Sequence, residues 1–260
     1  MPKQQPVMAA GVDGCKAGWF VAIASAAKQV DRPFVQHILT LKNCFLAGSF
    51  TDVLSVTSDC NLVCVDIPVG LSDSKQRQCD LAAREILGKP RASSVFTAPI
   101  RPCLSANDYE TASRISFKHS GKKLNKQSFF IMGKIRQVDD LMTPRLQTRV
   151  REVHPEISFW ALNGKKPMRY GKRKLPGRNE RIKLLSCVFP EAEAIVAKSC
   201  KRREVAADDI LDALVAAWTA SQAVMGEVKT LPENPEINSK GLRMEILCPA
   251  SPLDNSELYR

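Results

Sequence analysis

Two short apolar runs in the first quarter of the chain each end in an aspartate. Val7 to Val12 is followed by Asp13, and Asn61 to Val65 is followed by Asp66. Runs of this length and composition are typical of buried β-strands. An unpaired carboxylate inside such a strand would cost on the order of several kcal/mol. Asp66 therefore needs a partner, a metal or the open end of a sheet, whereas Asp13 also fits the ordinary turn role of an Asp-Gly step.

The surrounding pattern predicts a single α/β domain over residues 7–249. A hairpin is expected at residues 7–25, with its turn at Asp13 to Gly18, and a third strand at 35–41. Further strands are expected at 61–67, 150–153 and 242–247. Helices are predicted at 50–56, 75–87, 155–162, 178–187, 191–199 and 205–225. We expect a mixed central sheet with helices packed on it.

Two segments depart from this pattern. Residues 105–148 combine helical periodicity with many charges, which predicts a helical insertion. Residues 163–183 contain nine lysines and arginines, with glycine and proline among them, which predicts a mobile basic loop. Such a loop is commonly just solvated, and its functional interpretation is a flap that grips phosphates. Because Tyr170 is the one aromatic residue in it, we do not expect the loop to be a base-stacking platform.

The amino-acid composition indicates which binding partners and which compartment to expect. With 38 Lys and Arg against 27 Asp and Glu, the net charge of +11 favours anions such as nucleic acid, nucleotides or acidic lipids. No run of 18 apolar residues and no signal-peptide pattern is present, so we expect no membrane association. Nine cysteines without a Cys-x-x-Cys pair fit a reducing compartment, and we expect a cytoplasmic protein without structural zinc.

Three aspartates border the buried face of the last predicted helix, at Asp208, Asp209 and Asp212. The first two have an ordinary explanation, because acids at a helix start cap it and complement its dipole. Asp212 lies a full turn further in, where it adds repulsion without any capping benefit. A bound cation would remove that cost.

The absence of several well-known motifs makes some enzyme classes less favoured. No nucleophile elbow, P-loop or dinucleotide-binding glycine pattern follows a predicted strand. Glu156 lies in the first turn of its helix, so dipole complementarity alone explains it, and His154 fits a cap or a core histidine.

The order of hairpin, third strand, helix and fourth strand, followed by a late acidic helix, resembles the ribonuclease H-like superfamily. Within it, the chain looks like the family of domain of unknown function 429, described as predicted nucleases, over about residues 9–249. The segments that carry the resemblance are GVDGCKAGW (11–19), VDIPVGL (65–71), Arg77 with Cys79-Asp80 and Ala83-Arg84, RASSVF (91–96), EVHPE (152–156) and DDILDAL (208–214). The last also looks like the final acidic motif of Holliday-junction resolvases.

The resemblance implies a mixed five-stranded sheet flanked by helices and a site for Mg²⁺ or Mn²⁺. The metal-binding and catalytic positions carried over are Asp13, Asp66, Asp209 and Asp212, with Glu156 as a further ligand. The implied phosphate-binding residues are Lys16, Arg77, Arg84 and Arg91, with His154 and Asp208 as accessory residues. Resolvases carry Glu where this chain has Asp66, which shortens the reach by one methylene.

We therefore expect an enzyme, a metal-dependent nuclease that hydrolyses phosphodiester bonds by a two-metal mechanism. The alternative is a non-hydrolytic nucleotide- or nucleic-acid-binding member of the same superfamily. DNA, RNA, a branched junction and a small phosphoester all stay open as substrates. Cleavage of a junction would require a symmetric homodimer.

Overall fold

The central sheet contains five strands in the order β3-β2-β1-β4-β5. The computed structural model describes residues 6–31, 34–200 and 205–249. The strands are β1 (Val7–Cys15), β2 (Gly18–Asp31), β3 (Phe34–Ala47), β4 (Leu62–Asp66) and β5 (Val150–Glu152). The first three pair antiparallel, whereas β4 runs parallel to β1 and β5 parallel to β4. The predicted mixed five-stranded sheet is confirmed.

The parallel pairing of β1 with β4 brings a residue near the end of β1 beside the last residue of β4. Asp13 lies directly opposite Asp66 in the register. Both are therefore at the carboxyl end of the sheet, where the strands open toward loops. Pro68 cannot donate a ladder hydrogen bond and follows shortly after β4 ends.

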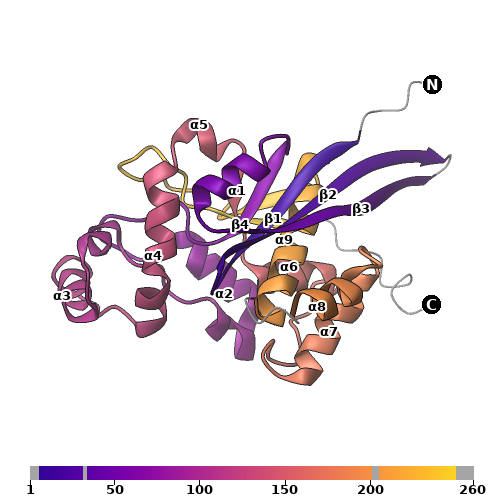
Figure 1. Ribbon diagram of the computed structural model, residues 1–260. Helices are drawn as coiled ribbons and strands as arrows, with labels where there is room; N and C mark the ends of the chain where they lie inside the picture. The colour runs from indigo at the N-terminus through magenta and orange to yellow at the C-terminus, as the bar shows by residue number, and fades with distance from the viewer. Residues whose placement is uncertain (1–5, 32–33, 201–204, 250–260) are drawn as a thin grey trace.

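Helices cover both faces of the sheet (Figure 1). On one face, α1 (Phe50–Val56) and α4 (Lys126–Leu141) pack against the strands through a core that includes Val12 and Val21. On the other face, α9 (Ala207–Val224) packs with α6 (Pro155–Leu162), α7 (Leu175–Ser186) and α8 (Ala192–Cys200) against Phe20 and Ala22. Side chains alternate along a strand, so the α9 face receives every second residue.

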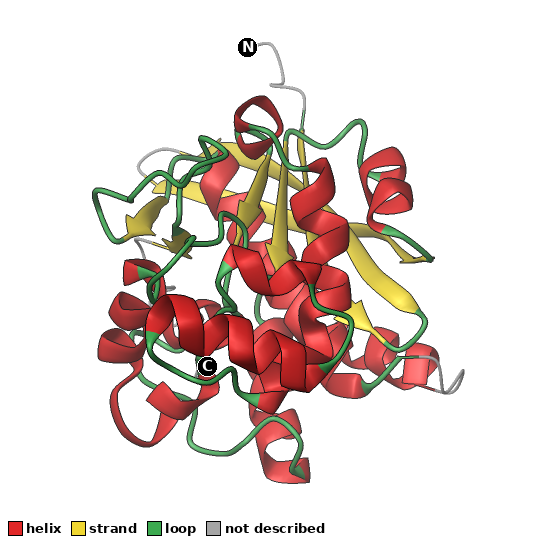
Figure 2. Cartoon of the chain, turned by 90° about the vertical axis from the view of Figure 1, so that its left-hand side faces the viewer, coloured by secondary structure: helices red, strands yellow, loops and turns green. Residues whose placement is uncertain are grey.

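The remaining elements are mainly helical (Figure 2). They comprise α2 (Gln78–Arg91), two 3₁₀ turns (Ala92–Ser94 and Arg101–Ser105), α3 (Tyr109–Ser120) and α5 (Pro144–Gln147). The predicted stop at Gly88 appears as a break in α2, where Gly88 has φ of 58°. A second sheet pairs β6 (Val228–Leu231) with β7 (Ile246–Pro249). The sequence did not predict β6, and β7 begins four residues later than the strand expected at 242–247.

Gly11 allows α9 to lie directly on β1. A Cβ atom at this position would be 2.0 Å from the backbone nitrogen of Ala217 and 2.1 Å from the carbonyl oxygen of Ala213. The helix presents small side chains here, and Ala213, Ala216 and Ala217 are all fully buried. Because residues two apart share a face of a strand, Asp13 points toward the same helix as Gly11.

Within the described ranges, no helix combines the length and the apolar content that crossing a bilayer requires.

We expect Gly11→Ala to destabilise the protein, because the added methyl group meets backbone that cannot move aside. Overpacking of this kind costs about 1 to 3 kcal/mol or more. Gly133→Ala is the matched control, since Gly133 lies inside α4 and nothing stands within 4 Å of its Cβ position. That change should raise the free energy of unfolding by about 0.5 to 1 kcal/mol, because alanine has a higher helix propensity than glycine. Urea unfolding measures both, and a Gly11→Ala protein as stable as the wild type would contradict the close contact.

Candidate metal centre

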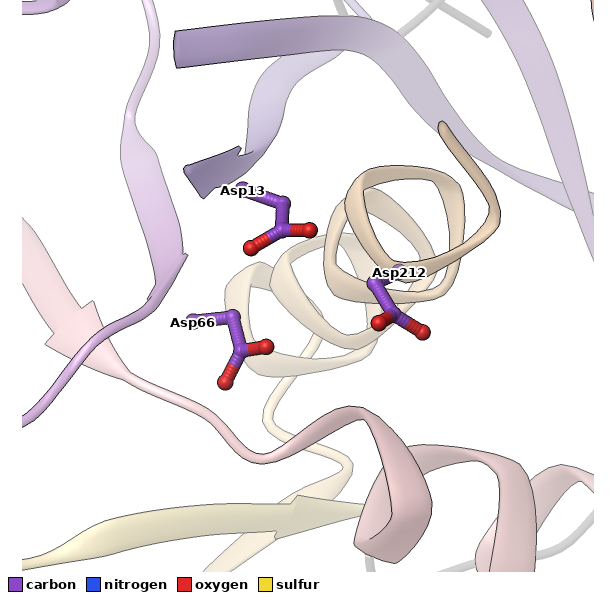
Figure 3. A group of neighbouring side chains, drawn as sticks. All are labelled: Asp13, Asp66 and Asp212. Carbon is purple, nitrogen blue, oxygen red and sulfur yellow. The ribbon is translucent and has the colours of Figure 1, made fainter. Parts of the chain in front are cut away.

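Three aspartates from distant parts of the chain converge at the carboxyl end of the sheet. Asp13 comes from the end of β1, Asp66 from the end of β4 and Asp212 from α9. Their side chains turn toward a common space (Figure 3). One carboxylate oxygen of each lies within 4.8 Å of the others. Asp13 is 7% exposed and Asp212 is 1% exposed, so these acids are largely removed from water.

Burial and mutual repulsion make the ionised forms of these acids costly. Burial, and then the charges of Asp66 and Asp212, raise the pKa of Asp13 well above its ordinary value. Burial and the charge of Asp212 raise the pKa of Asp66 to about 8. Burial also raises the pKa of Asp212. Three carboxylates held this way need protons or a nearby cation to neutralise them.

Lys172 supplies a positive charge to this cluster. Its ammonium group forms an ion pair with Oδ2 of Asp212. Burial works to lower the pKa of Lys172, but the charges of Asp212, Asp66 and Asp13 outweigh it and raise the pKa. The pairing is incomplete, because Oδ1 of Asp212 is buried and has no hydrogen-bond partner among the described residues.

The donor set fits a divalent metal ion. Mg²⁺ and Mn²⁺ prefer carboxylate oxygens, and a pair of such ions is typically shared by carboxylates on separate rigid elements. Here two adjacent strands and one helix hold the three carboxylates, and the unpartnered Oδ1 of Asp212 is a free ligand atom. Lys172 and a metal ion would compete for the same negative charge.

Asp209 and Asp208 lie beside the cluster but outside the group of three. Oδ2 of Asp209 accepts a hydrogen bond from the backbone nitrogen of Ala206 at 3.3 Å, which is the capping role. Burial and the charge of Asp208 raise the pKa of Asp209 to about 6. Asp208 lies 4.0 Å from Nε of Arg173. Their carried-over roles as ligand and accessory residue stay predictions.

Glu156 and His154 occupy buried positions at the start of α6. Glu156 forms an ion pair with the fully buried Arg181, and its Oε2 has no hydrogen-bond partner within the described ranges. His154 is the N-cap residue of α6, although its side chain makes no capping bond. Burial and the charge of Lys172 lower the pKa of His154 to about 4, so the ring is neutral at physiological pH.

The predicted phosphate-binding residues have different environments. Lys16 is exposed in the turn between β1 and β2. Arg84 donates through Nε to the carbonyl oxygen of Val95 at 2.7 Å. Arg91 ends α2 half-buried, and its Nε has no partner in the described part of the chain.

Arg77 is engaged in a buried network and is not free to bind phosphate. Its guanidinium pairs with Asp80 at 2.6 Å and with Glu152 at 2.7 Å, and it also donates to the carbonyl oxygen of Val69. Glu152 in turn accepts a hydrogen bond from the backbone nitrogen of Val69 at 2.6 Å. The network ties α2 and β5 to the segment that follows Asp66, so Arg77 has a structural role at the edge of the site.

The basic loop predicted at 163–183 is anchored, and its second half is helical because α7 begins at Leu175. Arg181 donates to the carbonyl oxygens of Tyr170 and Gly177. The carboxylate of Glu180 accepts hydrogen bonds from the backbone nitrogens of Arg169 and Tyr170. These contacts hold the segment that carries Lys172 against the acids, and the helix in its second half corrects the expectation of a loop throughout 163–183.

Lys172 and Lys134 are functional candidates that sequence reasoning missed. Lys172 was one cation among nine in the basic segment, and no local pattern distinguished it. Lys134 lies in α4, where its Nζ is 4.8 Å from the centre of the Trp19 ring and donates to the carbonyl oxygen of Gly18. A Cβ atom at Gly14, next to Asp13, would be 2.5 Å from Cδ of Lys134.

Residues 11–237 match the family described as "Protein of unknown function (DUF429)". The chain belongs to this family. No match was found among curated proteins. Among solved structures, this DUF429 protein is similar to one titled "Thermus thermophilus RuvC structure". The identity is 12%, the TM-score is 0.30, and the similarity covers 85% of this chain and 97% of that one.

Replacing Arg77 tests the structural role assigned to it in the DUF429 protein. Arg77→Ala leaves two buried carboxylates without their partner, and breaking such a pair costs about 3 to 5 kcal/mol. Lys75→Ala is the control, because it removes a surface ion pair to Glu236 with side chains 60% and 36% exposed, worth about 0 to 1 kcal/mol. Chemical unfolding compares them, and equal stabilities would contradict the role.

Replacing Lys172 tests the electrostatics of the cluster. Lys172→Gln removes the cation from three crowded acids. In the presence of EDTA we expect the free energy of unfolding to fall by about 1 to 3 kcal/mol. Mn²⁺ should then stabilise the variant more than it stabilises the wild type, because no side chain competes for Asp212. Lys174→Gln, which changes an exposed lysine of the same segment, serves as the control in thermal unfolding. Identical behaviour of the two variants would refute the competition.

Proposed function

We propose that this DUF429 protein is a metal-dependent nuclease that hydrolyses phosphodiester bonds in nucleic acid. The observation that carries the proposal is the convergence of Asp13, Asp66 and Asp212, with one buried oxygen of Asp212 left without a partner. A site that gathers three acids against their own repulsion costs stability. Sites of this kind are retained where a function requires them.

The residues have distinct parts in the proposed mechanism. Asp13 on β1, Asp66 on β4 and Asp212 on α9 would hold the metal ions, with Asp209 as a further ligand. Mg²⁺ or Mn²⁺ would activate water and neutralise charge on the phosphodiester. The fixed strand ends and α9 hold the carboxylates in place beforehand, which lowers the cost of ordering them.

Positive charge around the acids supports an anionic substrate. The chain carries a net charge of +11, and Lys134 and Lys172 lie next to the cluster. Lys16 is exposed in the turn that follows Asp13. These cations would attract a phosphate backbone toward the carboxylates, which by themselves repel it.

One observation favours a second candidate, a non-hydrolytic nucleic-acid or nucleotide binder. Lys172 already pairs with Asp212, so a side chain partly neutralises the acids without any metal ion. A protein of that kind would bind nucleic acid with strong salt dependence and would keep its affinity when the acids are changed.

Asp13→Asn separates the two candidates. We expect it to abolish Mg²⁺- or Mn²⁺-dependent cleavage of a labelled oligonucleotide and to remove metal-induced thermal stabilisation. The metal-free variant should be at least as stable as the wild type, because the raised pKa of Asp13 means that its charge opposes folding at neutral pH. The hydrogen bond that Oδ1 accepts from the nitrogen of Gly14 is retained by asparagine.

Asp59→Asn is the control, since Asp59 is exposed in the turn before β4, whereas Asp66 is the last residue of that strand. It should leave cleavage and metal response unchanged. Cleavage by Asp13→Asn at the wild-type rate would overturn the nuclease proposal. If the wild type does not cleave, and Asp13→Asn binds nucleic acid as tightly as the wild type, the binder is favoured.

A further inference from the structure

The outer face of α4 carries a phenylalanine that is almost fully in solvent. Phe130 is 79% exposed, while Ile135 and Val138 on the same helix are fully buried. A large aromatic side chain in water is unfavourable relative to a buried one. The helix thus uses one face for the core and presents an aromatic ring on the other.

Two lysines flank this ring on the same side of the helix. Lys126, Phe130 and Lys134 are spaced four residues apart, so they share a face, with a rise of about 6 Å between neighbours. We call these three residues the α4 stripe. Lys126 is exposed, and nothing stands within 4 Å of a Cβ built at Gly133, so the surface beside the ring is open.

The stripe leads to the metal centre. Lys134, its last member, packs its methylene chain beside Gly14, the residue that follows Asp13. Phe130 precedes Lys134 by about one helical turn along α4, and Lys126 precedes it by about two. Exposed Lys122 and Lys123 continue the positive charge in the segment before α4.

The chemistry of the stripe fits single-stranded nucleic acid. Cations separated by an aromatic ring bind phosphates while a base stacks on the ring, and every base offers a face for such stacking. The step of about 6 Å between neighbouring members of the stripe, which is four residues along the helix, lets an extended strand contact them in succession. A duplex hides its base faces within the stack and offers its backbone and the base edges in its grooves, neither of which stacks on a ring.

We propose that the α4 stripe is the binding surface for a single strand that enters or leaves the metal centre, with a base stacked on Phe130. The inference deepens the proposed function by naming the form of the substrate near the site. It rests on that function for its purpose, but the binding itself needs no metal ion and is measured separately.

Anisotropy of a labelled single-stranded oligonucleotide, measured with the full chain in EDTA, tests the proposal. Phe130→Ala should weaken binding about tenfold, in line with the loss of one stacked base. Phe130→Trp should retain affinity, whereas Phe130→Leu should lose it like alanine, because leucine is apolar but cannot stack. None of the three should lower the melting temperature, since the ring is 79% exposed.

Two further variants sharpen the test. Phe117→Ala is the matched control, because Phe117 is also exposed, at 57%, but lies on α3 outside the stripe. It should leave affinity unchanged. Lys126→Ala should reduce the slope of log affinity against log salt by about 0.7, the value for one phosphate contact on a single strand.

The proposal is overturned if Phe130→Ala binds the single strand as tightly as the wild type. It is also overturned if Phe117→Ala loses as much affinity, or if Phe130→Ala loses as much affinity for a duplex. The outcomes remain distinct from those of the proposed function. Weakened binding in Phe130→Ala, together with no cleavage by the wild type in Mg²⁺ or Mn²⁺, would support the stripe and refute the nuclease. Cleavage by the wild type, together with unchanged affinity in Phe130→Ala, would support the nuclease and refute the stripe.

Discussion

The contact between Gly11 and α9 determines the rest of the site. Without a side chain at Gly11, the backbone of α9 rests on β1, with atoms of Ala213 and Ala217 about where a Cβ would be. Asp13 follows two residues later on the same face, and Asp212 is adjacent to Ala213. The approach that fills the core therefore also brings these two carboxylates together, while the parallel pairing of β1 with β4 adds Asp66. One packing constraint thus assembles residues about 200 positions apart.

This assembly has an electrostatic cost that the protein only partly offsets. Burial and like charges raise the pKa of Asp13 and of Asp66, so the acids favour protons or cations over the free ionised state. Lys172 meets part of that demand from a segment anchored by Arg181 and Glu180. The same features that make the cluster unstable alone make it selective for positive charge. Lys172 thereby neutralises part of the negative charge for which a metal ion would compete.

Local patterns predicted the parts of the fold that local physics controls. The apolar runs before Asp13 and Asp66, and the helix carrying Asp212, were clear in sequence because strand and helix periodicities are short-range. The partners of buried polar groups were not predictable in this way. Arg77 was expected to bind phosphate, and only the fold reveals its pairing with Glu152, 75 residues away. Similarly, the sequence does not distinguish Lys172 from the neighbouring cations, because the close approach of Gly171 to Gly177 beside it is visible only in the fold. Strand β6 was missed because four residues give little periodicity.

The direct test of the central claim is the anomalous signal from a crystal of the full chain soaked in Mn²⁺. We predict a peak within coordination distance of Asp13, Asp66 and Asp212, with the ammonium group of Lys172 displaced from Oδ2 of Asp212. A well-ordered site without such a peak, in which Lys172 still pairs with Asp212 at saturating Mn²⁺, would contradict it.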